Sequence, residues 1–175
     1  MCAHASDTTT DYRINPIIRT ELCDDPVESI PLQWPDDCGA ECIFLGRTRV
    51  EMHTDFGTLL RLEYEAYEPM AHRALDAMSQ TAVERFNCRA VRIAHALGPV
   101  APGQASVVIQ TVCGHRDAAF AACRYLIDRL KRELPIWKRE IWQRGETFVD
   151  GCTAGPTGET NGPQCNENSE SGHDG

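Results

Sequence analysis

The residues best suited to chemistry in this sequence lie between positions 114 and 144. This stretch holds eight Lys or Arg residues against four Asp or Glu residues, whereas the 175-residue chain has a net charge of −9. It opens with the pair His115-Arg116 and contains two lysines seven residues apart, Lys131 and Lys138. A concentrated cationic stretch in an acidic protein suggests a site for an anionic small molecule. A lysine close to other cations has a lowered pKa, which makes it a better nucleophile or acid–base group near neutral pH.

The lysines also have ordinary structural explanations. Lys131 is spaced to share a helix face with Arg124 and Asp128, and such a face is often solvated with an ion pair along the helix. Lys138 and Glu140 lie two residues apart in a predicted strand, so they point the same way, as surface pairs commonly do. Taken singly, each of these residues is better explained by structure than by chemistry.

Two further cationic features would suit a phosphate group. His115-Arg116 directly precedes a predicted helix N-terminus, where backbone N–H groups and the helix dipole favour an anion. The segment 46–49, Gly-Arg-Thr-Arg, follows an apolar run, and two arginines at a strand end can clamp a phosphate. A solvated loop explains that segment about as well. Sequence spacing alone does not bring these features and the lysines into one pocket.

The hydrophobic pattern predicts the elements that would position these groups. Apolar or alternating runs predict strands over 40–46, 60–67, 91–97, 106–112 and 136–142. Apolar stripes at helical spacing predict two helices, one starting at Pro69 and one running from about Asp117 to Leu134. The turn over 98–103 predicts a hairpin between the strands it joins. This order predicts an α+β fold in which a mixed sheet carries both helices on one face.

Several residues are expected in the core. The buried stripe of the second helix is predicted to comprise Phe120, Cys123, Ile127, Leu130 and Leu134. The strand over 40–46 is also expected to be buried, because it is a short apolar run that ends in glycine. His95 alternates with aliphatic residues, which predicts a buried, hydrogen-bonded histidine rather than a ligand.

The charge distribution divides the chain into one body and two tails. Residues 1–31 and 152–175 each contribute a net charge of −4, which leaves −1 for the body. Residues 1–12 and 152–175 lack core-forming periodicity, so we expect disordered tails on a single domain over 13–151. One short basic cluster does not provide the broad basic face that nucleic acid requires.

The cysteines and the hydropathy pattern narrow the class of protein further. The nine cysteines include no C-x-x-C pair and no zinc-site spacing, so we expect no metal. Reduced thiols used as small core residues of a cytoplasmic protein are the favoured interpretation. No apolar run approaches the roughly 20 residues needed to span a bilayer, and the N-terminus lacks an apolar signal segment.

Six segments match, in order, the motifs of one known family. They are 44–49 (FLGRTR), 62–67 (LEYEAY), 98–103 (GPVAPG), 115–120 (HRDAAF), 127–131 (IDRLK) and 135–140 (PIWKRE). Over about residues 38 to 150 the chain thus resembles the catalytic large subunit of molybdopterin synthase. The resemblance implies an α/β-hammerhead-like α+β fold. It also implies a sulfurtransferase of molybdenum cofactor biosynthesis that requires no cofactor.

The same resemblance implies a substrate and two partners. The expected substrate is cyclic pyranopterin monophosphate, which is converted to the dithiolene of molybdopterin. The expected sulfur donor is a thiocarboxylate on the C-terminal Gly-Gly of a small ubiquitin-like subunit. A second copy of the chain is expected to form the central homodimer of a heterotetramer.

By matching position, the resemblance implies that Lys131 and Lys138 are catalytic. With these lysines, the implied pterin-phosphate pocket includes Arg47, Thr48, Arg49, His115, Arg116, Arg139 and Glu140. Three positions depart from the family: Thr48 replaces an aliphatic residue, Ala96 a common arginine and Phe148 a frequent tryptophan. A module that binds a ubiquitin-like tail without sulfur transfer is the alternative, and a generic phosphoryl-ligand protein is a distant third. The retained lysines and His-Arg pair favour the enzyme.

Overall fold

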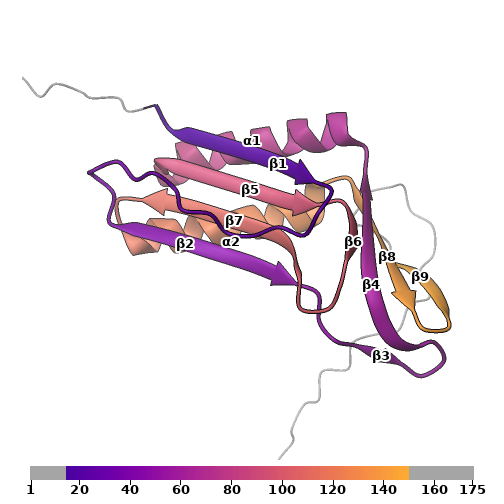
Figure 1. The fold of residues 1–175 in the computed structure, drawn as a ribbon. Helices are drawn as coiled ribbons and strands as arrows, with labels where there is room; N and C mark the ends of the chain where they lie inside the picture. Colours follow the sequence, from indigo (N-terminus) through magenta and orange to yellow (C-terminus); the bar gives the residue numbers. More distant parts are fainter. Residues whose placement is uncertain (1–14, 150–175) are drawn as a thin grey trace, which may run out of the picture.

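The computed structural model describes residues 15–149, which form one mixed α+β arrangement (Figure 1). The elements are β1 (Ile17–Cys23), β2 (Ala40–Arg47), β3 (Met52–His53), β4 (Gly57–Ala66), α1 (Glu68–Phe86), β5 (Ala90–Ala96), β6 (Gly98–Val100), β7 (Ala105–Cys113), α2 (Arg116–Glu133), β8 (Ile136–Trp142) and β9 (Gly145–Val149). A four-stranded sheet has the order β1-β5-β7-β2. A second sheet has the order β3-β4-β8-β9, with β6 also paired to β4.

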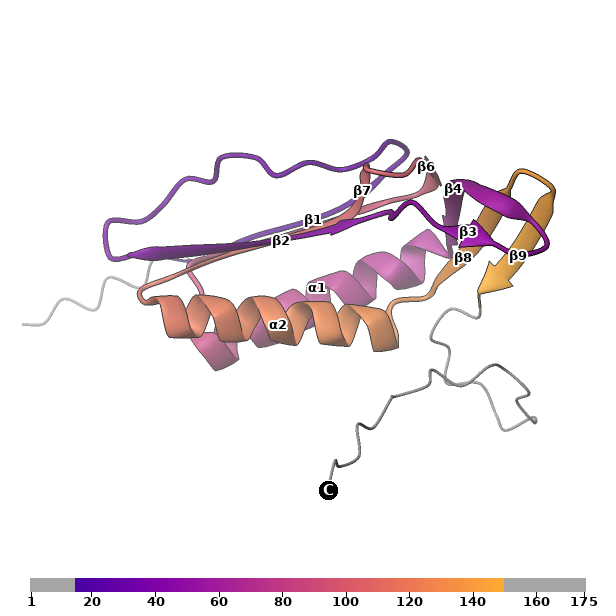
Figure 2. The same ribbon diagram turned by 90° about the horizontal axis from the view of Figure 1, so that it is seen from below.

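Both helices pack on one face of the four-stranded sheet, as the sequence predicts (Figure 2). The main core lies between the helices and the sheet and includes Leu75, Met78, Ile93, Ile109 and Leu126. The sheet is mixed because β1 pairs with β5 in parallel, whereas the other neighbours are antiparallel. Residues 24–39, hereafter the covering segment, run across the opposite face of this sheet.

A buried ionic network fixes the path of the covering segment. Arg92 on β5 is only 5% exposed, and its guanidinium donates to the Glu21 carboxylate at 2.7 Å and to the Glu28 carbonyl oxygen at 3.0 Å. It also donates to Oε1 of Gln110 at 3.1 Å, and the Gln110 amide bonds both backbone groups of Ile30. A buried charge is costly unless it is paired and hydrogen-bonded, so this network favours one position of the segment.

All the predicted strands and both predicted helices are present with similar bounds. β5 and β7 form the predicted hairpin, and β6 lies in the turn that joins them. The strands β1, β3, β6 and β9 were not predicted. β1 is hard to predict from its own residues, because its strand conformation depends on pairing with β5, which lies far along the chain. The predicted domain and tail boundaries at residues 12, 13, 151 and 152 lie outside the described residues.

Two burial predictions were wrong. Ile43 in β2 is 46% exposed, because β2 is an edge strand of its sheet rather than a central one. Phe120 in α2 is 61% exposed, although Cys123 and Ile127 on the same stripe are buried. Both exposed side chains lie along the same flank of the molecule, where α2 runs beside β2. Neither helix described for residues 15–149 is long and apolar enough to cross a membrane.

Candidate active site

Lys131 lies in the last turn of α2 and lines a cavity between α2 and β2. The cavity has a volume of about 440 Å³ and is lined by Cys42, Ile43, Phe44, Phe120, Cys123, Arg124, Ile127, Asp128 and Lys131. Arg124, Asp128 and Lys131 therefore share one face of the helix, as their spacing predicts. Burial raises the pKa of the Cys123 thiol to about 12, which keeps it protonated and unreactive at neutral pH. Lys131 is thus a better candidate than this thiol for chemistry in the cavity.

Lys138 lies on β8, and its ammonium is 3.1 Å from Oε1 of Glu140. The two side chains are 30% and 16% exposed, so the pair is partly removed from water. Tyr64 of β4 is opposite Lys138 in the strand register. The predicted common direction of Lys138 and Glu140 is therefore confirmed. The ion pair with the carboxylate restricts the positions open to the ammonium.

Arg139 points to the other face of the same strand. It is opposite Glu63 in register and forms ion pairs with Glu63, with Glu65 at 3.9 Å and with Glu146 at 3.4 Å. Hydrogen bonds from Arg61 and then Arg139 lower the pKa of Glu63. Successive side chains of a strand point to opposite faces, so the ion pairs of Arg139 are separate from the pair of Lys138 with Glu140. Lys138 and Arg139 nevertheless both line one cavity of about 280 Å³.

His115 and Arg116 lie at the start of α2, where a cavity of about 400 Å³ is lined by Gly39, Gly114, His115, Arg116 and Asp117. His115 is the N-cap residue, but its side chain does not cap the helix. The Gly39 amide donates to the Gly114 carbonyl at 3.2 Å, and a Cβ at Gly39 would lie 2.9 Å from that oxygen. Glycine at position 39 therefore allows the close approach that shapes this cavity. The exposed Arg116 at a helix N-terminus without a side-chain cap suits an anion.

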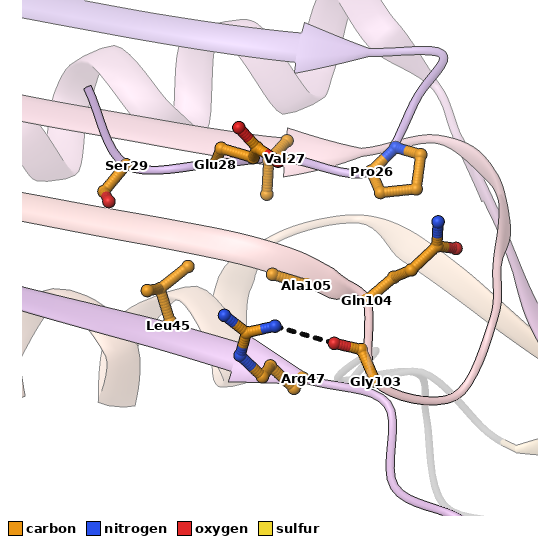
Figure 3. A pocket seen from close by; sticks show the side chains of 9 residues that line it. All are labelled: Pro26, Val27, Glu28, Ser29, Leu45, Arg47, Gly103, Gln104 and Ala105. Atoms are coloured by element: carbon orange, nitrogen blue, oxygen red, sulfur yellow. Dashed lines mark hydrogen bonds between the residues drawn. The ribbon is translucent and has the colours of Figure 1, made fainter.

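The loop after β2 directs its residues to different places. Arg47 donates to the Gly103 carbonyl at 2.7 Å, within a cavity of about 300 Å³ beside the covering segment (Figure 3). Thr48 is buried, and its hydroxyl has no hydrogen-bond partner among the described residues. Arg49 is largely exposed, with Glu51 at 2.8 Å. Of these three residues, Arg49 is the most accessible to a ligand.

The predicted site residues form two groups at opposite ends of the four-stranded sheet. Arg49, Lys131 and Lys138 belong to the end where β2 and α2 finish and β8 begins, whereas His115 and Arg116 belong to the other end. An α-helix rises about 1.5 Å per residue, so the part of α2 between Arg116 and Lys131 spans roughly 22 Å. A small substrate cannot contact both groups within one chain.

Two polar residues near Lys138 were missed from the sequence. Thr147 on β9 donates its hydroxyl to Oε2 of Glu140 at 3.1 Å. The indole N–H of Trp142 donates to the Thr147 hydroxyl oxygen at 2.9 Å. Gly145, directly after the turn at Gln143-Arg144, was the available signal for a hairpin. Because β9 was not predicted, these contacts could not be inferred. Among residues 15–149, no group of three or more His, Cys, Asp or Glu side chains is arranged to hold a metal ion.

Comparison with known proteins identifies one family. A family model described as "MoaE protein" matches residues 21–133, which include His115, Arg116 and Lys131 but not β8. A molybdopterin synthase catalytic subunit of Arabidopsis thaliana is 40% identical over 126 residues, which is 72% of this chain and 63% of that protein. The chain therefore spans less than two thirds of the length of that relative.

Solved structures agree with this comparison. The crystal structure of molybdopterin synthase from Staphylococcus aureus has a TM-score of 0.66 and 30% identity, over 74% of this chain and 95% of that one. A complex of subunits 1 and 2 of molybdopterin-converting factor from Helicobacter pylori has a TM-score of 0.60. It covers 75% of this chain and 90% of that one, and at 20% identity it supports the fold alone.

Proposed function

Because the chain belongs to the MoaE protein family, we propose that it is the catalytic subunit of a molybdopterin synthase. In this role it transfers sulfur from the thiocarboxylated C-terminus of a small ubiquitin-like subunit to cyclic pyranopterin monophosphate. The product is the dithiolene of molybdopterin. The observation that carries the proposal is the position of Lys131 and Lys138 on either side of the junction from α2 to β8, with Glu140 holding Lys138 at 3.1 Å.

The residue types suit this reaction. Attack by the thiocarboxylate sulfur forms a carbon–sulfur bond to the pterin side chain and displaces an oxygen substituent, which leaves with a proton. Water then hydrolyses the thioester that joins the two molecules, which leaves the sulfur on the pterin and a carboxylate on the small subunit, and a second thiocarboxylate repeats the sequence. Both steps require a proton donor and acceptor, which positioned lysines can supply. We assign the direct role on the acyl group to Lys131 and the positioning of substrate or transfer of a proton to Lys138. The cyclic phosphate of the substrate suits His115, Arg116 and Arg49.

The separation of the two cationic groups supports a site shared between two copies of the chain. Arg116 and Lys131 are at opposite ends of α2. If a second copy packs against the first with its α2 antiparallel, Arg116 of each copy approaches Lys131 of the other. A two-fold axis makes this exchange reciprocal, so a homodimer would contain two equivalent sites.

The flank formed by α2 and β2 is the surface that suits this second copy. β2 is an edge strand, and an edge strand presents unpaired backbone groups that favour pairing with another chain. The flank also exposes Ile43 and Phe120, which lie along the cavity that contains Lys131. Contact through this flank would bury both apolar side chains and close the cavity with residues of the second copy.

A small ubiquitin-like subunit is the proposed second partner. The support comes from the family and from the similar curated proteins, whose name, molybdopterin synthase catalytic subunit, implies a further subunit. Its flexible C-terminal Gly-Gly could reach the lysines where α2 meets β8, because that end of the molecule is open to solvent at Lys131. We also propose that the protein acts in the cytosol. This rests on the type of reaction, which is a step in the biosynthesis of an enzyme cofactor.

A reaction assay tests the proposed activity. The chain is incubated with cyclic pyranopterin monophosphate and a thiocarboxylated small subunit, and the dithiolene product is measured. Product formation that depends on the thiocarboxylate supports the enzyme. Tight binding of the small subunit without product would instead favour the module that binds a ubiquitin-like tail.

Mixed dimers test the shared site separately. Arg116→Ala and Lys131→Ala chains are unfolded, mixed and refolded together. If each site takes Arg116 from one copy and Lys131 from the other, mixed dimers have one intact site, and the mixture recovers about a quarter of wild-type activity. If both residues act within one chain, the mixture stays as inactive as each variant alone.

A further inference from the structure

The position of Lys138 depends on a chain of contacts that runs across β8 and β9. Oε1 of Glu140 is 3.1 Å from the Lys138 ammonium, and Oε2 accepts the Thr147 hydroxyl at 3.1 Å. Both carboxylate oxygens are therefore used, one by each neighbour. Thr147 is directly opposite Glu140 in the strand register, so the backbone places its hydroxyl at the carboxylate.

The direction of the Thr147 hydroxyl is decided by its other neighbour. The Trp142 indole N–H, which can only donate, points to the Thr147 oxygen at 2.9 Å. The oxygen must accept this bond, so the hydroxyl proton remains free to point at Glu140. Trp142 is only 6% exposed, and it packs with Leu59 and Leu62 in a small core cluster. Packing therefore fixes the position of the Trp142 indole N–H, which is the first donor in this series of contacts.

These contacts restrict the position of the Lys138 ammonium, which the lysine side chain by itself does not. An ammonium on a long flexible side chain is a poorly fixed point charge. Among the described residues, Glu140 is the carboxylate within ion-pair distance of Lys138. A carboxylate held at one oxygen by a hydroxyl cannot rotate freely, so it presents its other oxygen to the ammonium in one orientation. Hydrogen-bonded networks of this kind also strengthen their members when partly buried.

We propose that Thr147 is a positioning residue that orients Glu140 and, through it, the ammonium of Lys138, with Trp142 setting the direction of its hydroxyl. The consequence for sulfur transfer rests on the proposed function, but the positioning itself does not. Thr147 touches neither substrate nor reacting atoms in this assignment. Its hydroxyl, rather than its bulk, is the part that acts.

The chain offers a matched set of variants. Thr147→Val removes the hydroxyl and keeps the branched shape that suits a strand, whereas Thr147→Ser keeps the hydroxyl and removes the methyl group. Trp142→Phe removes the donor that directs the hydroxyl. Glu146→Gln is the control, because Glu146 is the neighbour of Thr147 on β9 and pairs with Arg139 on the other face of the strand.

The first measurement is independent of activity. In the full chain labelled with ¹⁵N-lysine, the ammonium signal of Lys138 is assigned by its loss in Lys138→Gln. A fixed ion pair slows proton exchange with water. We expect a resolved, slowly exchanging signal in the wild type, Thr147→Ser and Glu146→Gln. We expect at least a several-fold faster exchange in Thr147→Val and an intermediate rate in Trp142→Phe. An unchanged signal in Thr147→Val, with the melting curve showing a folded protein, would overturn the proposal.

The second measurement connects positioning with the reaction. Thr147→Val should lower kcat about tenfold, equivalent to about 1.4 kcal/mol, with little change in KM, and Thr147→Ser should restore most of kcat. The valine change should add nothing when Glu140 is already glutamine, since both changes would interrupt the same contact chain. Equal loss in Thr147→Ser and Thr147→Val would show a packing role and contradict the proposal. A wild-type chain without any activity would instead contradict the proposed function, and the ammonium signal would still decide the role of Thr147.

Discussion

Arg116 is the first residue of helix α2, and Lys131 lies in the last turn of the same helix. A rigid helix keeps these two cations roughly 22 Å apart at about 1.5 Å per residue. Both are expected from the family resemblance to act on one small anionic substrate. One chain cannot bring both cations to the same small substrate, so the proposed mechanism requires a second copy of the chain.

The lysines are the first test. Lys131→Ala should reduce dithiolene formation by at least about 100-fold, in the range expected for loss of a proton-transfer group. Lys138→Ala should also reduce it severely. Lys131→Arg should not restore activity, because a guanidinium stays protonated and cannot act as a base or nucleophile. Product formed per turnover is measured with excess thiocarboxylated small subunit.

The matched control for Lys131 is Arg132→Ala, which removes the neighbouring exposed cation of the same helical turn. It should retain near-normal activity. The variants should all keep the helical signal and the dimer mass of the wild type. Near-normal activity of Lys131→Ala would defeat the mechanism and favour the module that binds a ubiquitin-like tail.

The anion contacts are the second test. Arg116→Ala and Arg49→Ala should each weaken binding of cyclic pyranopterin monophosphate by about 1.5–3 kcal/mol, the typical value of a hydrogen bond to a charged group. Folding should change little, because Arg116 is highly exposed and Arg49 has a surface ion pair. Titration calorimetry and melting curves separate the two effects. Arg73→Ala, on the exposed surface of α1, is the control. Early melting with normal binding in both variants would assign these arginines a structural role.

The α2–β2 flank is the third test. Phe120→Glu and Ile43→Glu each place a charge where the proposed dimer would bury an apolar side chain, so both should shift the dimer to monomers at micromolar concentration. Activity should fall with the dimer, since each site needs both copies. Light scattering measures the mass. Met52→Glu is the matched control, because Met52 is an exposed apolar residue of β3 at 80% exposure, away from this flank. A stable dimer in both flank variants would place the interface elsewhere.

The buried histidine gives a pH dependence, which is the fourth test. His95 is 5% exposed, its Nδ1 lies 2.8 Å from the Ala96 carbonyl oxygen, and its ring meets Tyr64 edge-on. These features confirm the prediction of a buried, hydrogen-bonded histidine. Burial lowers the pKa of His95 below its ordinary value of 6.5. The unfolded chain therefore binds the proton more readily than the folded one.

The sign of the effect follows from this difference. The contribution of His95 to stability is complete above about pH 6.5 and is lost as the pH falls through the lower folded pKa. The free energy of unfolding should therefore fall by up to about 1.4 kcal/mol per pH unit within that window. Urea unfolding at several pH values between 7.5 and 5 measures it. His95→Gln should be less stable at neutral pH but should have a smaller slope, and an equal slope in both proteins would show that other groups cause it.

Much of the fold could be predicted because its elements are locally encoded. The stripe from Ala71 to Ala82 in α1 and the alternation in β5 predict a helix and a strand without knowledge of their neighbours. The errors at Ile43 and Phe120 have a common cause. An apolar pattern favours burial of a side chain, but it does not show whether the strand or helix that carries it lies at the edge of the fold.

The sequence by itself determined the chemical groups and their local directions. The sequence supplies the two lysines and places the His-Arg pair at the start of a helix. It also predicts that Lys138 and Glu140 share one face of a strand, because side-chain directions follow the periodicity of the strand. Only the tertiary structure decided which groups meet. β8 pairs with β4 rather than with the four-stranded sheet, and this pairing gives Arg139 three glutamate partners on the far face. β9 pairs with β8 and brings Thr147 to Glu140. Such contacts depend on strand pairing and register. Both arise from the packing of the whole domain, so no local sequence pattern predicts them.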